Sequence, residues 1–297
     1  MQTFDHFRCY LCGNASYTIR PGKARDNPSL VPLECTVCGL VVLSSFEHIS
    51  KSFYEDSRMH ADAPCAQDII TQIGHEDGAR RYNDFLHFLV EKNVLDIGCG
   101  DGSFLALAKT VASKVVGVEP DKRWRAKHKT LGLEVVPSLS DLPSGAIFDT
   151  VSMFHVLEHI PDPLQLLDNI LTFLEKKSKG GGKLLVEVPS ANDALLTLYE
   201  NKAFSEFTYW SCHLFLYTPD TLQALMRKAG LLTLEMRQYQ RYPLANHLYW
   251  LVNGKPAGQT RWPELNTSTL NHAYADALAA LGKCDTIIGI FEPTNKA

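Results

Sequence analysis

The sequence predicts an α/β protein built on a doubly wound, mostly parallel sheet of seven strands, with a small cysteine-bearing lobe ahead of it. Three observations carry this prediction. Apolar runs of strand period alternate with runs of helical period from residue 93 onward, which is typical of parallel strands joined by helices. A glycine-rich turn joins the first of these strands to the first helix, and two Cys-x-x-Cys pairs precede the whole alternation.

The cysteine pairs, Cys9-Tyr-Leu-Cys12 and Cys35-Thr-Val-Cys38, predict a zinc ribbon over residues 1 to about 48. A glycine follows each pair and suits the tight turn around a metal, so that four thiolates can converge on one tetrahedral ion. Two disulfides would use the same cysteines, but a reducing compartment disfavours them. Because so short a lobe buries little apolar surface, a structural zinc ion would supply its folding free energy.

The composition limits the class of protein. A chain of 297 residues with 45% hydrophobic and 21% charged residues is ordinary for a globular protein, and it is long enough for one α/β domain plus a smaller module. The formal net charge of −4 argues against a general nucleic-acid binder. We find no secretory signal and no apolar run near the roughly 18 residues of a membrane span, so we expect a cytoplasmic protein without a membrane span.

The elements are expected in the following order. The ribbon would have strands near 17–20 and 40–43, and a helical connector over 49–92 would place Tyr82, Phe85, Leu86 and Leu89 on one face of a helix. The domain itself would cover 93–297. Its strands are expected at 93–98, 114–119, 133–136, 148–154 and 183–188, its helices at 102–112, 120–131, 162–178 and 218–229, and an antiparallel edge pair at 231–239 and 285–291.

An insertion at about 240–284 separates the two edge strands. Its aromatic and arginine side chains suit binding of a sugar or ring that carries phosphate or carboxylate. The same composition fits a homodimer interface or a capping hairpin equally well. Basic residues also cluster on the helix expected at 120–131. We interpret them as a solvated helix face, because the chain as a whole is acidic.

The glycine turn after the first strand indicates the ligand class. Its glycines are spaced G-x-G-x-G, and Ser103 stands where a dinucleotide-binding turn needs its third glycine. Asp96 lies inside the strand just before the turn, where its carboxylate would repel a pyrophosphate but suit a cationic amine and sulfonium. Glu119 ends the next strand, at the place where an acid accepts ribose hydroxyls.

These residues resemble motif I and the ribose-binding acid of the class I methyltransferases that depend on S-adenosylmethionine (SAM). The resemblance implies a Rossmann-like methyltransferase domain and SAM as cofactor. An NAD-type enzyme is the weaker alternative, and a non-catalytic SAM-fold scaffold is the rival from another class. The residues expected to bind the cofactor are Asp96, Gly98, Cys99, Gly100, Gly102, Glu119, Pro120 and Phe154.

The segment His155-Val-Leu-Glu158-His159 follows the fourth strand and should border the ligand site. It resembles the post-strand motif of ubiquinone-type O-methyltransferases and deoxysugar C-methyltransferases, as do Leu184 to Ser190 and the later run from His213 to Thr218; this resemblance covers about 93–240. The pattern H-x-x-E-H also occurs in zinc peptidases, but it needs a continuous helix, and two prolines leave only one turn here. His155 and His159 are therefore expected to support the cofactor loop or to act as a base.

The segment Tyr209-Trp-Ser-Cys-His213 resembles the Tyr-x-Glu-His site of zinc-bearing sugar C-methyltransferases, with Trp210 and Cys212 in place of the tyrosine and glutamate. Because two polar partners are lost and His213 remains, the sequence favours methylation of oxygen, with His213 as the base. The predicted acceptor is a small molecule, a hydroxyl of a sugar, glycan or related metabolite; phenols and peptides stay open. Carbon methylation of a nucleotide-linked sugar is the alternative.

Overall fold

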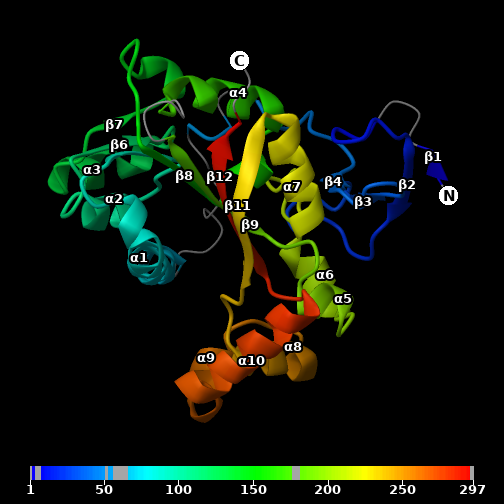
Figure 1. Ribbon diagram of the computed structural model, residues 1–297. Coiled ribbons are helices and arrows are strands. Elements are labelled where there is room, and N and C mark those ends of the chain that lie inside the picture. The colour runs from blue at the N-terminus through cyan, green and yellow to red at the C-terminus, as the bar shows by residue number, and fades with distance from the viewer. Residues whose placement is uncertain (1, 4–7, 51–52, 56–65, 176–180, 295–297) are drawn as a thin grey trace.

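The fold is described from a computed structural model, which covers residues 2–3, 8–50, 53–55, 66–175 and 181–294. Its main sheet has seven strands in the order β11-β12-β9-β8-β5-β6-β7 (Figure 1). Five of them are parallel and the edge pair β11–β12 is antiparallel, as the sequence predicts. The strands are β5 (Asn93–Ile97), β6 (Lys114–Val118), β7 (Val135–Val136), β8 (Thr150–Phe154), β9 (Lys183–Pro189), β11 (Leu231–Tyr239) and β12 (Thr286–Pro293).

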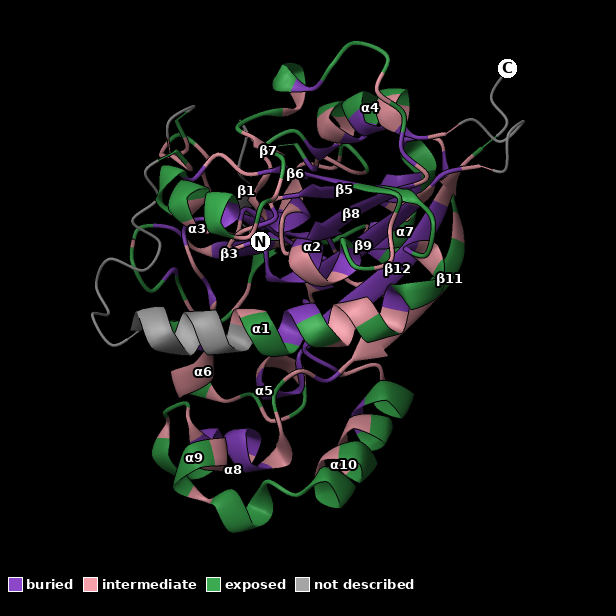
Figure 2. Cartoon of the chain, turned by 90° about the vertical axis from the view of Figure 1, so that its left-hand side faces the viewer, coloured by how far each residue is buried: buried purple, intermediate pink, exposed green. Residues whose placement is uncertain are grey.

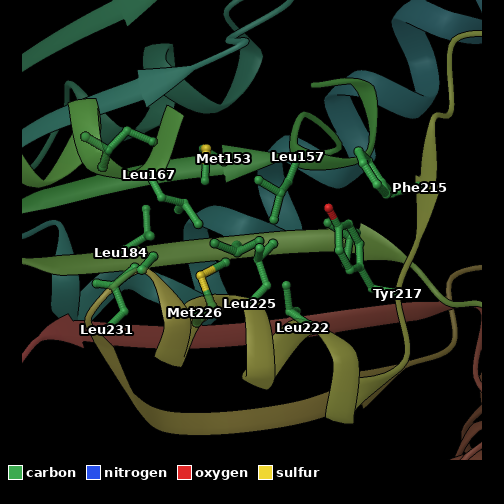
Figure 3. Close-up of a cluster of buried hydrophobic side chains, with 14 of the residues drawn as sticks. Met153, Leu157, Leu167, Leu184, Phe215, Tyr217, Leu222, Leu225, Met226 and Leu231 are labelled. Atoms are coloured by element: carbon green, nitrogen blue, oxygen red, sulfur yellow. The ribbon is translucent and has the colours of Figure 1, made fainter. Parts of the chain in front are cut away.

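Helices cover both faces of this sheet. On one face α4 (Pro163–Phe173) and α7 (Pro219–Lys228) pack on alternate residues of the strands, where Leu167, Leu225 and Met226 surround Met153 and Leu184 (Figure 3). On the other face α1 (Ala66–Phe85) and α2 (Ser103–Ala108) pack against the strand residues that point the opposite way, such as Val94 and Leu185. Such burial on both faces explains the nearly continuous apolar runs of the central strands.

Local sequence fixes where the helices begin. The Asp162 side chain accepts the backbone amide of Gln165 at the start of α4, and Pro163 occupies the first turn. Thr218 and Thr221 form a reciprocal capping box at the start of α7. The helices α2, α3 (Arg125–Thr130) and α4 are shorter than predicted, and a 3-10 turn, η2 (Lys122–Trp124), stands where the helix expected at 120–131 would begin.

The helix before the sheet corrects one expectation. Phe85 and Leu89 are fully buried, but Leu86 is 37% exposed and does not share their face. The α-helix ends at Phe85, and a 3-10 turn, η1 (Leu86–Phe88), follows it. Because a 3-10 turn has about three residues per turn instead of 3.6, the helical period used for the prediction fails at Leu86.

The N-terminal lobe shares a sheet with the rest of the chain. Its strands β1 (Gln2–Thr3), β2 (Ser16–Ile19), β3 (Pro32–Cys35) and β4 (Val41–Leu43) are joined by β10 (Phe215–Leu216), which sequence analysis missed. In β10, Phe215 lies opposite Val42 and Leu216 opposite Val41. The division of the chain at residues 48 and 92 stays a prediction.

The insertion between the edge strands is helical, not a capping hairpin. It forms α8 (Leu244–Asn253), α9 (Gly258–Arg261), η6 (Pro263–Leu265) and α10 (Ser268–Leu281). Figure 2 shows these helices together at one end of the sheet, with α10 largely exposed. Tyr249 and Trp262 pack edge to face on each other, with ring centroids 5.0 Å apart. Among the described residues, no helix combines the length and apolarity that a membrane span requires.

Candidate active site

A cleft of about 1480 Å³ opens at the carboxyl ends of the parallel strands. Its walls come from the glycine turn after β5, the end of β6, the segment after β8 and the start of the helical insertion. Ligands of doubly wound sheets bind at this edge. The volume exceeds the roughly 300–1,000 Å³ of a typical small-molecule pocket, so the cleft has room for two ligands side by side.

Glu119 and the glycine turn form one end of the cleft. The backbone amide of Gly100 donates to Oε2 of Glu119 over 2.8 Å, and the amide of Asp121 donates to Oε1 over 2.8 Å. Gly100 has φ +52°, and an added Cβ there would meet no heavy atom within 4 Å. The turn therefore leaves open space beside a carboxylate that two amides hold in place, although burial raises the pKa of that carboxyl.

Seven of the eight predicted cofactor residues line the cleft, and Gly102 does not. A Cβ at Gly102 would come within 2.7 Å of the Leu133 side chain and 3.2 Å of His128. The residue thus lets the beginning of α2 approach the segment before β7. Sequence analysis grouped it with the other glycines because spacing alone does not tell close packing from contact with a ligand.

Asp96 is buried at the base of the cleft. The hydroxyl of Ser152 donates to its Oδ1 over 2.7 Å. Burial raises the pKa of Asp96 to about 7, although Ser152 and the charge of Arg81 act in the opposite direction. A nearby cation would favour the ionised form of this carboxyl.

A buried charge cluster lies beside Asp96 and centres on Glu187 of β9. Arg80 donates to both carboxylate oxygens over 2.8 and 2.9 Å, Arg81 donates over 2.7 Å, and Nε2 of His155 lies 3.1 Å from Oε1. Burial alone would raise the pKa of Glu187, but Arg81, His155 and Arg80 outweigh it and hold that pKa well below its usual range. Arg81 also stacks on Phe154, which ties the cluster to the cleft wall.

The three predicted catalytic histidines also line the cleft. His155 follows β8 with φ +56°, an uncommon conformation for a non-glycine residue, and its Nδ1 lies 3.3 Å from Oε1 of the fully buried Glu158. His159 belongs to η4 (Leu157–His159), the single turn that the prolines predicted. Its ring centroid lies 4.8 Å from that of His213. Burial, reinforced by His159, lowers the pKa of His213 to about 3.

The four N-terminal cysteines form a second cluster in the other sheet. The Sγ atoms of Cys9 and Cys38 lie 3.4 Å apart, and those of Cys12 and Cys35 lie 3.5 Å apart. All four are free thiols in this structure. A tetrahedral zinc ion with bonds of about 2.3 Å needs sulfur atoms roughly 3.8 Å apart, so the arrangement fits the ion after a small expansion.

Comparison with known proteins identifies the family. A family model described as a methyltransferase domain matches residues 74–235. The chain belongs to this family. A ubiquinone biosynthesis O-methyltransferase of Cereibacter sphaeroides is 27% identical over 188 residues, which is 58% of this chain and 73% of the relative. Another protein of that name, from Ruegeria sp., is 24% identical over 219 residues, which is 68% of this chain and 86% of the relative.

Solved structures agree on the fold. A SAM-dependent methyltransferase from Archaeoglobus fulgidus superimposes with a TM-score of 0.51 at 18% identity, over 74% of this chain and 94% of that one. The protein is thus a SAM-dependent methyltransferase, as the glycine turn and Glu119 predict. The finer question is which atom of which acceptor this methyltransferase modifies.

Sequence analysis missed several residues that shape the methyltransferase's cleft. Arg80 and Arg81 were not singled out, and neither was Arg25, whose guanidinium lies 4.1 Å from the ring centroid of Trp210. Asp77 was missed as well; it bonds to Arg241, one of the insertion's arginines that the sequence did place over the site. The only local signal for the Glu187 cluster was an acid inside an otherwise apolar strand.

Proposed function

We propose that the methyltransferase moves the methyl group of SAM to a hydroxyl of a small, ring-bearing acceptor. The observation that carries this proposal is the continuous cleft, which runs from Glu119 past the histidines to the helical insertion. One end has the features of a nucleoside site and the other is lined by aromatic rings, with the histidines between them. A concave cleft lined by apolar and aromatic side chains suits a small-molecule acceptor.

The cofactor end fits SAM. Glu119 would accept hydrogen bonds from both ribose hydroxyls, and the open space at Gly100 would take the methionine part. Asp96 gains a cationic partner when an amine lies beside it, which would return its raised pKa towards the usual range. SAM supplies an activated methyl group on a cationic sulfur, which an aligned nucleophile displaces.

The acceptor end has flat apolar surfaces and two arginines, Arg25 and Arg241. Phe207, Trp210 and Tyr242 line it, and the guanidinium of Arg25 stacks on Trp210. Such surfaces hold a sugar or phenol ring, and the relatives named ubiquinone biosynthesis O-methyltransferases favour an oxygen acceptor. The acceptor proton would leave near His159 and His213. Burial lowers the pKa of both histidines and makes each a weak base, so we do not assign this proton to His213 alone.

We further propose that the cysteine cluster holds one structural zinc ion. The four sulfur atoms lie within 4.8 Å of one another and offer the closed four-thiolate set of structural sites. The lobe they hold carries Arg25 to the cleft and pairs through β4 with β10. Zinc would therefore fix one wall of the acceptor site.

The identity of the acceptor is tested by transfer of label from methyl-labelled SAM to two panels of compounds, catechol-type phenols and nucleotide-linked sugars. Each compound is matched by an analogue in which hydrogen replaces the hydroxyl. We expect label in a hydroxyl-bearing compound and none in its matched analogue. The Glu134→Ala variant serves as an active control, because Glu134 makes only an exposed ion pair with Lys114. Label bound to carbon or nitrogen would contradict oxygen methylation, and SAM binding without transfer to any acceptor would favour a scaffold.

A further inference from the structure

A second set of metal-ligating side chains lies beside the cleft, outside the cysteine ribbon. Ligand atoms of His159, Cys212 and His213 all lie within 4.8 Å of one another. Cys212 is 1% exposed, whereas both histidines line the cleft. Sequence analysis did not group these three residues, because His159 and Cys212 are far apart along the chain and the H-x-x-E-H pattern pointed to different partners.

Backbone hydrogen bonds hold the two segments in place. The amide of Leu214 donates to the carbonyl of Glu158 over 2.7 Å, and the amide of Leu43 donates to the carbonyl of Leu214 over 3.0 Å. The hydroxyl of Tyr54 donates to the carbonyl of His159 over 3.0 Å. The side chains therefore project from a framework that η4, β10 and β4 share, which favours a preformed site.

The hydrogen bond of His159 settles which of its nitrogens is available. Nδ1 lies 2.8 Å from the carbonyl oxygen of Cys212, and a carbonyl can only accept, so Nδ1 carries the proton. The lone pair is then on Nε2. Histidines that bind metals are oriented in this way, by donation of the other ring N–H to a carbonyl or carboxylate.

The other two side chains are also available as ligands. Among the residues that the structure describes, no hydrogen bond joins the imidazole of His213 or the thiol of Cys212 to another side chain, and Cys212 is a free cysteine. The His213 ring packs edge to face on two neighbouring rings, at centroid distances of 4.8 Å to His159 and 5.8 Å to Trp210. Cys212 is buried, whereas His159 and His213 are only partly buried and line the cleft, so an ion could reach the three side chains from the cleft.

We propose that His159, Cys212 and His213 bind one zinc ion with an open position towards the cleft. Two imidazoles and a thiolate suit zinc, and three protein ligands with a free fourth position are typical of catalytic rather than structural zinc. The ion is distinct from that of the four-cysteine ribbon. Cys212 would lose its proton on binding, as thiol ligands of zinc do.

The open position of the ion would take the oxygen of the acceptor hydroxyl. This role of the ion rests on the proposed function. Zinc lowers the pKa of a bound hydroxyl, so the proton passes to water without a strong protein base. The oxygen then bonds to the methyl carbon as the carbon–sulfur bond breaks, which leaves a methyl ether and S-adenosylhomocysteine. His213 is a ligand in this arrangement, not the base that the sequence predicted.

Metal content tests the site without any acceptor. We expect two equivalents of zinc in the purified full-length protein, one in each of the single variants Cys212→Ala and His213→Ala, and two in the control Cys284→Ala. Cys284 is a matched control because it is a fully buried free thiol that does not line the cleft. One equivalent in the wild type that both variants retain would overturn the proposal.

Cobalt substitution of the wild type guards against a variant that fails to fold. A cobalt-loaded protein should show two sets of thiolate absorption bands, one from four sulfurs and one from a single sulfur with two nitrogens. Bands of the four-sulfur site alone would overturn the proposal. If the second ion is present but no hydroxyl acceptor is methylated, the metal site stands and the proposed function fails. Wild-type turnover in zinc-depleted Cys212→Ala would instead overturn the catalytic role of the ion.

Discussion

Replacing Glu187 by glutamine should lower the free energy of unfolding by about 3–5 kcal/mol, the typical cost of removing one partner from a buried ion pair. The variant keeps the shape of the side chain, so the loss comes from charge and not from a cavity. Arg80 and Arg81, each with a side chain that is 13% exposed, would keep their charges without the fully buried carboxylate between them. Urea denaturation followed by circular dichroism measures the difference.

The pH dependence provides a second check on Glu187. Its pKa is depressed in the folded protein, so its contribution to stability is complete above the unfolded pKa of about 4.3 and is lost as the pH falls through the folded value. The difference between wild type and Glu187→Gln should therefore shrink below about pH 4. It should also fall as the pH rises through the pKa of His155, which Glu187 helps to raise. As a control, Glu134→Gln removes an exposed ion pair and should cost less than about 1 kcal/mol. Equal costs at the two sites would show that the cluster contributes nothing.

The second large effect is expected from the double variant Cys9→Ser/Cys35→Ser. It should lose one equivalent of zinc and leave the N-terminal lobe without the roughly 10–16 kcal/mol that binding of a structural zinc ion supplies. Serine preserves the size of the side chain but is a poor ligand for zinc. Metal analysis combined with limited proteolysis follows both consequences, and we expect new cleavage within residues 8–50. If the double variant keeps the zinc content of the wild type and the remaining thiols, Cys12 and Cys38, titrate as free, the ribbon assignment is wrong.

The effect of this variant should extend beyond the lobe. Because β4 pairs with β10, loss of the ribbon removes backbone partners from the strand that follows His213. Ala191 would also lose the bond that its carbonyl accepts from Arg20 over 2.6 Å. SAM binding at Glu119 should survive, since none of these contacts involves the glycine turn. A variant that loses zinc, acceptor turnover and SAM affinity together would show a global collapse instead.

The sequence was most informative where structure depends on neighbouring residues. The main-sheet strands and the beginnings of α4 and α7 follow from periodicity and capping residues, which act within a few positions. The same local logic failed at Leu86, where one turn of different helical pitch moved a single side chain. The strand β10 is only two residues long, and it exists because β4 supplies its partner.

The site shows the same limit. The glycine turn and Glu119 lie on adjacent parallel strands, so their meeting follows from the fold class. The cluster around Glu187 joins β9 to α1, a helix more than 100 residues earlier in the chain. No local sequence pattern predicts that contact. His159 and Cys212 meet through η4 and β10, so their proximity could be predicted only after the N-terminal sheet was known.

The most direct test of the central assignment is a calorimetric titration of SAM into the wild type, Glu119→Ala and the control Glu134→Ala. Loss of a charge-assisted pair of hydrogen bonds to the ribose should weaken binding by about 2–3 kcal/mol, or roughly 30- to 150-fold in Kd. The control should bind like the wild type, because Glu134 is half exposed and does not line the cleft. Unchanged SAM affinity in a folded Glu119→Ala protein would contradict the placement of the cofactor at Glu119.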